Sequence, residues 1–277
     1  MVTQNWCESP LEKLEVAEME KEIAWYFRTA SICKRKLVGN PVADLLKTTV
    51  GDFKTTLPIV NCLRAPGLKA RHWEQIHKVA GFEIENQNLT MAELMNRGIT
   101  DKVEQIEIIA TEAINENVLQ GMLSKVAADW KDMDFELKSY KEIKDVWIIG
   151  AVDDVFQLLD DSLVTIGAIM GSRYVGAIRD NVETWHKKLL LLQATLDQWL
   201  ECQKTWMYLE PIFAAPDIQR QLPNESKVFK NVSFSWKDIM KQTSADPNCI
   251  KQGAMKGRRE AFAKNNAMLD GVQRGLE

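Results

Sequence analysis

Apolar side chains recur at spacings of three and four residues along most of the chain, which is the spacing of one buried face of an α-helix. The pattern is clearest over residues 185–206. Its stripe consists of Trp185, Leu189, Leu192, Leu196, Trp199, Gln203 and Trp206. Every member except Gln203 is apolar, so this helix must pack against other helices. The fold class is therefore predicted to be mainly α.

Further helices are predicted on both sides of this stripe, wherever the same spacing continues between glycines and prolines. One or two helices are predicted over residues 11–37, and in the segment 63–82 a turn at 66–67 is followed by a helix. The other predicted helices cover residues 41–55, 90–95, 100–130, 152–163, 228–240 and 253–276. Pro58 is expected to break the helix, because proline disfavours helical geometry at the preceding Leu57. Gly81 is expected to terminate the helix before it, and Thr100 to cap the helix after it. Residues 214–223 are interpreted as a long structured loop.

The helical pattern breaks near residues 135–150. Phe135, Leu137, Val146 and Ile148 fall on alternate positions, as in half-buried strands. We therefore predict a small β-hairpin, whose turn type stays open because no Asn-Gly or Asp-Gly pair is present. The chain is predicted to divide into a first helical bundle over residues 1–130, a hairpin insert over 131–152 and a second bundle over 153–277.

The segment 162–176 carries three closely spaced glycines, Gly167, Gly171 and Gly176. Glycine at this spacing indicates either a flexible stretch or a close approach between helices. The segment lacks the GK[ST] ending whose lysine and hydroxyl hold phosphate and magnesium, so it is not a nucleotide-binding P-loop.

Composition and charge exclude several classes of protein. With 45% hydrophobic and 27% charged residues among 277, the chain is long enough for one large or two ordinary well-cored domains. The net charge is -4, and no basic stripe interleaved with aromatics is present, so nucleic acid is not an expected partner. Five scattered cysteines fit reduced thiols in the cytosol. No apolar run approaches the roughly 20 residues that cross a bilayer, and no signal peptide is recognisable, so we expect a soluble intracellular chain.

Candidate catalytic and metal-binding groups do not form a pattern. His72 and His77 are five residues apart, so their side chains diverge by about 140° on a helix and cannot share a metal. Asp153, Asp154, Asp160 and Asp161 lack the spacing of a calcium loop and are interpreted as a solvated helix face. No serine, threonine or cysteine adjoins an evident base. No catalytic, cofactor-binding or metal-binding residue is therefore assigned.

Two motifs resemble the linker region of dynein heavy chains. There, a helix of the form WxxxQxxWxYLExIF runs into DIxxQLPxE. The matching residues here are Trp199, Gln203, Trp206, Tyr208, Leu209, Glu210, Ile212, Phe213, Asp217, Ile218, Gln221, Leu222, Pro223 and Glu225. An earlier LPxxxxL stretch with a turn and RHW is matched by Leu57, Pro58, Leu63, Arg71, His72 and Trp73. The sequence SRYVGAIRD over residues 172–180 is most similar to that of axonemal heavy chains, which are the dyneins of cilia and flagella.

The resemblance implies a mechanical function. A dynein linker is an elongated stack of helical bundles that arches over a ring of AAA+ modules, bends when ATP is bound and straightens in the power stroke. The chain stops abruptly inside its last helix at Glu277, so we expect a fragment that ends before that ring. ATP and magnesium would bind to the downstream modules, and no cofactor is expected in this fragment. No hydrolysis is expected from this chain alone.

The same resemblance implies the partners and the location. The expected direct partner is the AAA+ ring of the same heavy chain, with microtubules reached indirectly by a minus-end-directed motor. Dynein intermediate and light chains would associate with the parent protein. The expected location is the cytoplasm and cytoskeleton, in the axoneme of cilia or flagella. Gly167, Gly171 and Gly176 are the candidate hinge of the lever, since a switch needs a weak seam between stiff parts.

Two other readings stay open at the level of sequence. A static helical scaffold or tether would show the same periodicity, although it would not require the hairpin or the loop at residues 214–223. A helical enzyme with a dispersed active site has the least support, since no acid, base or nucleophile stands out. Trp25, Trp73 and Trp236 are candidates for exposed aromatics that dock on another domain.

Overall fold

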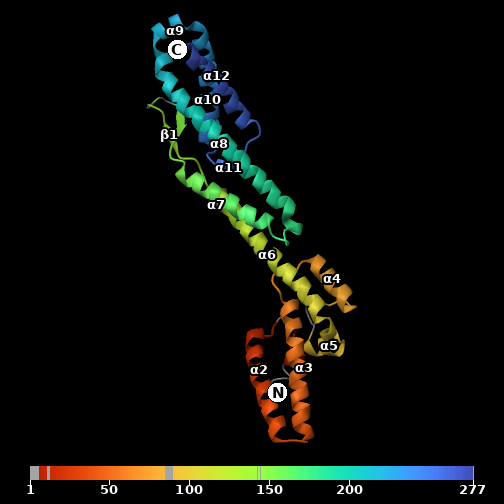
Figure 1. Ribbon diagram of the computed structural model, residues 1–277. Coiled ribbons are helices and arrows are strands. Elements are labelled where there is room, and N and C mark those ends of the chain that lie inside the picture. Colours follow the sequence, from red (N-terminus) through yellow and green to blue (C-terminus); the bar gives the residue numbers. More distant parts are fainter. Residues whose placement is uncertain (1–5, 11–12, 85–89, 142, 144, 277) are drawn as a thin grey trace. The chain divides into compact units, whose positions relative to one another are not determined.

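The computed structural model describes residues 6–10, 13–84, 90–141, 143 and 145–276 (Figure 1). The chain forms two compact units, Met1–Val118 and Leu119–Glu277. The boundary between them falls inside helix α6 (Val103–Lys131), which therefore contributes residues to both. The division into residues 1–130, 131–152 and 153–277 stays a prediction.

Unit 1, Met1–Val118, is built from helices. Its elements are α2 (Val16–Lys36), α3 (Pro41–Leu63), α4 (Ala70–Ala80), α5 (Met91–Asn96), the 3-10 helix η2 (Ile99–Lys102) and the start of α6. α2 and α3 lie side by side as a helical hairpin (Figure 1). Asn40 starts α3, because its side chain accepts a hydrogen bond from the backbone N–H of Val42 and Pro41 follows at the first helical position.

Pro58 does not end a helix, contrary to the sequence prediction, but lies inside α3. A proline in a helix interior costs about 3 kcal/mol, because one hydrogen bond is lost and the ring crowds the preceding turn. Leu57, Ile59 and Val60 are all buried around it, and each such side chain contributes about 1.5–3 kcal/mol. Burial of this segment therefore outweighs the local preference.

Of two other helix boundaries predicted in unit 1, the end at Gly81 is confirmed and the cap at Thr100 is wrong. Gly81 ends α4 in the left-handed conformation, with φ of 83°, which confirms the glycine stop. Thr100 is not a helix cap, because it lies inside η2 and the residue before that element is Gly98, with φ of 65°. Thr90 caps α5 instead, since its hydroxyl accepts from the backbone N–H of Glu93 at 3.3 Å.

Unit 2, Leu119–Glu277, surrounds one long helix. Its elements are the rest of α6, β1 (Leu137–Ser139), β2 (Trp147–Ile149), α7 (Asp153–Met170), the 3-10 helix η3 (Gly176–Ile178), α8 (Arg179–Ala214), α9 (Pro216–Gln221), α10 (Pro223–Ala245), α11 (Cys249–Gly253) and α12 (Arg258–Leu276). α8 packs against α7, α11 and α12 (Figure 1). The two strands form an antiparallel hairpin in which Leu137 pairs with Ile149. The prediction of a mainly α fold with a small hairpin is confirmed.

Residues 214–223 do not form the predicted long loop. α8 continues to Ala214 in spite of Pro211, and the one-turn helix α9 follows directly. Phe213 explains this, because it is buried at the end of α8 with its ring stacked 5.1 Å from that of Phe229 on α10. Gln219 of α9 then donates to the carbonyl of Phe213 at 2.8 Å, so the connection is braced rather than open.

The apolar stripe of α8 forms the centre of the core of unit 2. Leu189, Leu192, Leu196, Trp199 and Trp206 are fully buried, as the heptad spacing predicts. Trp25, Trp73 and Trp236, the three candidate docking residues, differ in their exposure to solvent.

Trp236 lies fully buried on α10, so its assignment as an exposed docking aromatic is wrong. Trp25 is 61% exposed, and Trp73 is partly buried against the core of unit 1. Among the residues with described structure, no helix combines the length and apolar character of a membrane span.

The three glycines of the candidate hinge lie at the end of α7 and in the turn before α8. Gly167 is inside α7, Gly171 follows its last residue, and Gly176 opens η3. An added Cβ would meet nothing within 4 Å at Gly167 or Gly176, and at Gly171 its nearest contact would be the carbonyl oxygen of Gly167 at 3.5 Å. Close helix packing is therefore not the reason for glycine at these positions.

Candidate functional site

The α8 motif brings most of its residues into one cluster with the β-hairpin. Trp199, Trp206, Leu209 and Phe213 are buried on one face of α8, and Gln203 and Glu210 lie on the side that meets the hairpin. Because Gln203 and Glu210 are seven residues apart, they lie on the same face of the helix, two turns from one another. α8 therefore holds the hairpin at two points.

Gln203 makes the first of these contacts. Its side-chain Nε2 donates to the carbonyl of Ile149 at 2.8 Å, and its Oε1 accepts from the N–H of Ile149 at 2.8 Å. In this hairpin the ladder bonds run from Gly150 to Glu136 and from Tyr140 to Val146. The peptide groups of Ile149 therefore point away from β1, as expected for a non-hydrogen-bonded pair. The single polar member of the apolar stripe satisfies both of them.

Glu210 makes the second contact, near the turn of the hairpin. Its Oε2 accepts from Lys141 Nζ at 2.8 Å and from the Tyr140 hydroxyl at 3.1 Å. These bonds raise the pKa of the Lys141 ammonium, with the hydrogen bond to Glu210 as the main cause. The Tyr140 ring also lies 4.9 Å from the ring of Trp206, so the turn is held by both polar and aromatic contacts.

An array of aromatic rings fills the space between α8, α10 and α12. Trp199 stacks on Phe262 of α12 at 4.7 Å, and Trp206 stacks on Trp236 of α10 at 5.5 Å. Trp206 Nε1 donates to the Ser233 hydroxyl at 3.2 Å. Stacked pairs of this kind contribute about 0.5–1.5 kcal/mol each beyond their buried area, so the array stiffens the bundle.

The sequence analysis did not identify two buried polar residues of unit 2, Arg258 and Asn248. Arg258 is 4% exposed, lies with its guanidinium carbon 5.8 Å from the Trp199 ring centre, and donates to Gln252 Oε1 at 3.0 Å. Burial lowers the pKa of its guanidinium. Asn248 donates to the carbonyl of Lys131 at 3.0 Å and accepts from the N–H of Lys251, so it joins the end of α6 to the start of α11. Asparagine is a favoured N-cap, so its place before α11 had a sequence signal, whereas its contact with Lys131 had none.

The remaining α8 and α9 motif residues lie at the surface or at its edge. Tyr208 is 61% exposed, and Asp217 is exposed and pairs with Arg220 on the same helix. Pro223 is the first residue of α10. Ile212, Ile218 and Leu222 are half-buried. These residues build the corner between α8 and α10 rather than a pocket.

The RHW motif forms a separate polar cluster in unit 1. Arg71, His72 and Trp73 lie on α4, and the Arg71 guanidinium pairs with the Glu116 carboxylate of α6. Glu116 is almost fully buried, whereas the Arg71 side chain is 42% exposed. His72 Nδ1 accepts from the N–H of Lys69 at 3.0 Å, and its Nε2 lies 3.3 Å from Glu116 Oε2 without the alignment of a hydrogen bond. The motif therefore anchors α4 to α6.

His72 makes the stability of unit 1 depend on pH. Burial first, and the neighbouring Arg71 second, lower the pKa of its imidazole. The unfolded chain then takes up a proton near pH 6.5 that the folded chain does not bind, so this contribution is present above pH 6.5 and is lost as pH falls from there toward the folded pKa. The melting temperature of unit 1 should fall between pH 7.5 and pH 5.5. His72→Gln should flatten that dependence, whereas His186→Gln on α8 should retain it; an equal slope in all three proteins would contradict the assignment.

The clusters described above are held together by hydrogen bonds, an ion pair and stacked aromatic rings. Most of their polar groups bond to one another and to the backbone, whereas the indole N–H groups of Trp199 and Trp236 are buried without a partner among the residues described. No nucleophile is paired with a base among the residues of these clusters. No group of three histidine, cysteine, aspartate or glutamate side chains is placed to hold a metal ion within the described ranges. Both motif clusters connect elements that are far apart in the sequence.

Comparison with known proteins identifies the family. The family model described as dynein heavy chain, N-terminal region 2, matches residues 1–277. The chain belongs to the dynein heavy chains. This dynein segment is 37% identical over 276 residues to dynein axonemal heavy chain 6 of Homo sapiens and 34% identical over 279 residues to dynein axonemal heavy chain 3 of Mus musculus. In both alignments it is covered over 99% of its length and spans 7% of the relative.

Proposed function

We propose that this dynein heavy-chain segment is the mechanical linker of an axonemal motor. It would bend and straighten across the AAA+ ring of its own heavy chain, and that movement would produce the power stroke of a minus-end-directed microtubule motor. The match of the whole chain to the N-terminal region of dynein heavy chains supports this, as does the similarity to axonemal relatives. The proposed location is the axoneme of a cilium or flagellum.

The structural observation that carries the proposal is the close packing of α8, which lies on the C-terminal side of the candidate hinge. α8 is 36 residues long, which corresponds to about 54 Å at 1.5 Å per residue. Its buried face is packed by α11 and α12, and the aromatic array and the hairpin contacts hold its second half. A body that transmits force must deform less than the joint about which it turns, and a helix braced in this way meets that requirement.

The rest of the parent heavy chain would supply ATP binding and hydrolysis. ATP and magnesium would bind to AAA+ modules of the same heavy chain, and dynein intermediate and light chains would bind to the parent. Hydrolysis and contact with microtubules are therefore proposed for the parent motor and not for this segment. A conformational switch requires that its two states differ by only a few kcal/mol, so that nucleotide can shift their populations.

Fluorescence energy transfer in the full-length motor tests this proposal. One fluorophore would replace the exposed Tyr208 of α8 through a non-natural amino acid, and a second would be placed on the ring. The lever predicts that transfer efficiency changes between the nucleotide-free and the ATP-trapped motor. A pair at Tyr208 and the exposed Phe234 of α10, both in unit 2 and both on the C-terminal side of Gly176, is the control and should stay constant. A constant signal for the first pair would favour the static scaffold.

The hinge of the lever is proposed to involve Gly167, Gly171 and Gly176. Alanine fits at each position without a close contact, so replacement acts mainly by restricting the backbone, by about 1 kcal/mol at Gly167 inside α7. The triple alanine variant should slow microtubule gliding by the full-length motor while unit 2 melts at the same or a higher temperature. Unchanged gliding velocity would rule out this hinge. Gly121→Ala, also free of contacts but on α6, is the matched control.

A further inference from the structure

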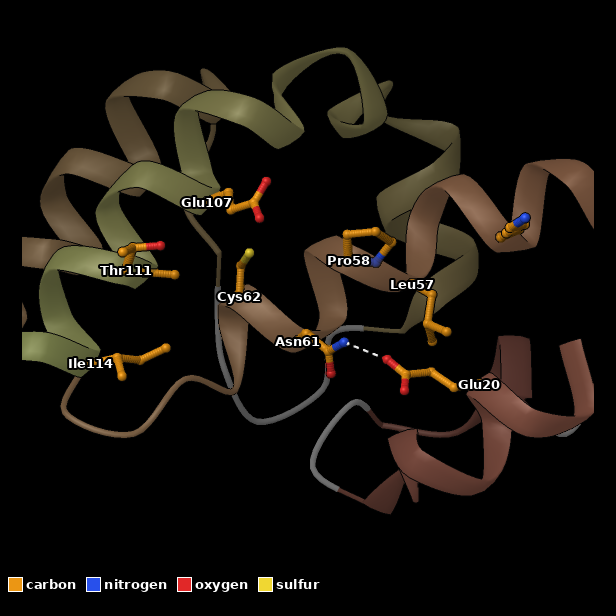
Figure 2. Close-up of a pocket in the computed structure, with 10 residues that line it drawn as sticks. Glu20, Leu57, Pro58, Asn61, Cys62, Glu107, Thr111 and Ile114 are labelled. Carbon is orange, nitrogen blue, oxygen red and sulfur yellow. Dashed lines mark hydrogen bonds between the residues drawn. The ribbon is translucent and has the colours of Figure 1, made fainter. Parts of the chain in front are cut away.

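Unit 1 contains a solvent-accessible pocket of about 410 Å³ between α2, α3 and α6 (Figure 2). Its apolar wall is formed by Leu57 and Pro58 of α3 and by Ala110 and Ile114 of α6. The volume lies within the range of about 300–1,000 Å³ that is typical of ligand pockets. Neither the α8 motif nor the RHW cluster contributes a residue to it.

Two carboxylates stand at the edge of this pocket, on different helices. Glu20 of α2 accepts a hydrogen bond from Asn61 Nδ2 at 3.0 Å, which fixes one of its oxygens and leaves the other facing outward (Figure 2). Glu107 of α6 lies close to the Cys62 thiol (Figure 2). The only cation in the lining is Lys54, whose ammonium lies 4.5 Å from the centre of the Phe27 ring and is held there by a cation–π contact.

Pro58 interrupts the hydrogen-bond pattern of α3 beside the pocket. Because proline has no N–H, the carbonyl of Lys54 one turn earlier has no helical donor. Residues 54 and 58 lie on the same face of α3, and both line the pocket. Pro58 therefore contributes the apolar surface of its ring to the wall of the pocket.

The Cys62 thiol does not change the apolar and acidic character of the pocket. Burial chiefly, and Glu107 next, raise its pKa to about 11, so the thiol stays protonated and weakly nucleophilic at neutral pH. The lining therefore combines an apolar wall with two carboxylates. This is the complement of a positively charged hydrogen-bond donor on an aliphatic stem, as in arginine and lysine.

We propose that this pocket is a docking site for a basic peptide segment, which inserts an arginine or lysine side chain between Glu20 and Glu107. Its aliphatic stem would lie on Leu57, Pro58 and Ile114. A peptide is favoured over a free amine because the rim residues Glu20, Asn61, Glu107 and Thr111 are exposed, so the site is open to a chain that continues past it. The proposal is independent of the lever function.

Methyl NMR of the whole 277-residue chain tests the docking site. The probe is a capped, alanine-rich helical peptide with two arginines and two leucines on one face. Its addition should shift the methyl signals of Leu57 and Ile114, with those of unit 2 unchanged. Glu20→Gln with Glu107→Gln should weaken binding at least about tenfold, since two charge-assisted contacts are lost. Thr111→Trp, at an exposed lining position, should block binding without altering the melting temperature.

Several outcomes would overturn the docking site. The first is an equal loss of binding in the matched control, Glu18→Gln with Glu104→Gln, which removes the same charge from exposed positions of the same two helices outside the lining. The second is an equal set of shifts from free spermidine at the same concentration, which would assign the pocket to small amines. The third is the absence of any shift with the arginine peptide, or the same shift with a peptide whose arginines are replaced by glutamine.

Discussion

Replacing Trp206 by alanine should lower the free energy of unfolding of unit 2 by about 3–5 kcal/mol, the usual cost of removing a large aromatic side chain from a core. Trp206 is fully buried, stacks on Trp236, contacts the Tyr140 ring and donates a hydrogen bond to Ser233. Its loss would leave a cavity where α8, α10 and the hairpin meet. Urea unfolding followed by circular dichroism measures the change.

Tyr208 provides the matched control for this measurement. It lies two residues further along α8 and is 61% exposed, so Tyr208→Ala should change the free energy of unfolding by no more than about 0.5 kcal/mol. The comparison tests the orientation of α8 directly, because a rotation of the helix would exchange the two results. Similar losses from both variants would contradict the described packing.

Replacing Arg71 by methionine should destabilise unit 1 by about 2–3 kcal/mol. The Glu116 carboxylate would remain buried without its cation, and removal of one partner of a buried ion pair costs more than the pair contributes. We expect a destabilisation at the low end of the range for buried ion pairs, because the Arg71 side chain is 42% exposed and its charge is partly screened by water. Thermal and urea unfolding of the single variant measure the loss.

A second substitution separates this cause from simple loss of packing. Glu116→Gln keeps the shape and an acceptor oxygen near His72 but removes the buried charge. The double variant should therefore be more stable than Arg71→Met alone, by roughly half of the initial loss. Lys78→Met, at an exposed position of α4, should cost no more than about 0.5 kcal/mol. Additive losses in the double variant would show that the charge is not the cause.

The sequence predicted the helical fold, the hairpin and the buried stripe because these depend on periodicity. The apolar spacing of α8 and the alternation near residues 135–150 report which side chains are buried, and burial dominates the energetics of both elements. Gln203 was recognisable as the one polar member of the stripe, although the strand that it binds, 54 residues away, was not.

The sequence failed where a distant contact overrides a local preference. Pro58 predicts an end to a helix, yet it is retained inside α3 because its neighbours are buried against other elements. The partners of Arg71 and Asn248 are 45 and more than 100 residues away, so no local pattern reveals them. The pocket in unit 1 depends on three helices and has no sequence signature at all.

The pair of hydrogen bonds between Gln203 and Ile149 has a consequence for aggregation. A two-stranded hairpin has an outer edge of unpaired peptide groups, and such an edge can pair with a strand of another molecule. The Gln203 amide occupies this edge at Ile149 in the way that a third strand would, and it does so with a single side chain. The same residue that attaches the hairpin to α8 thus blocks the outer edge of β2 at Ile149 against pairing with a strand of a neighbouring chain.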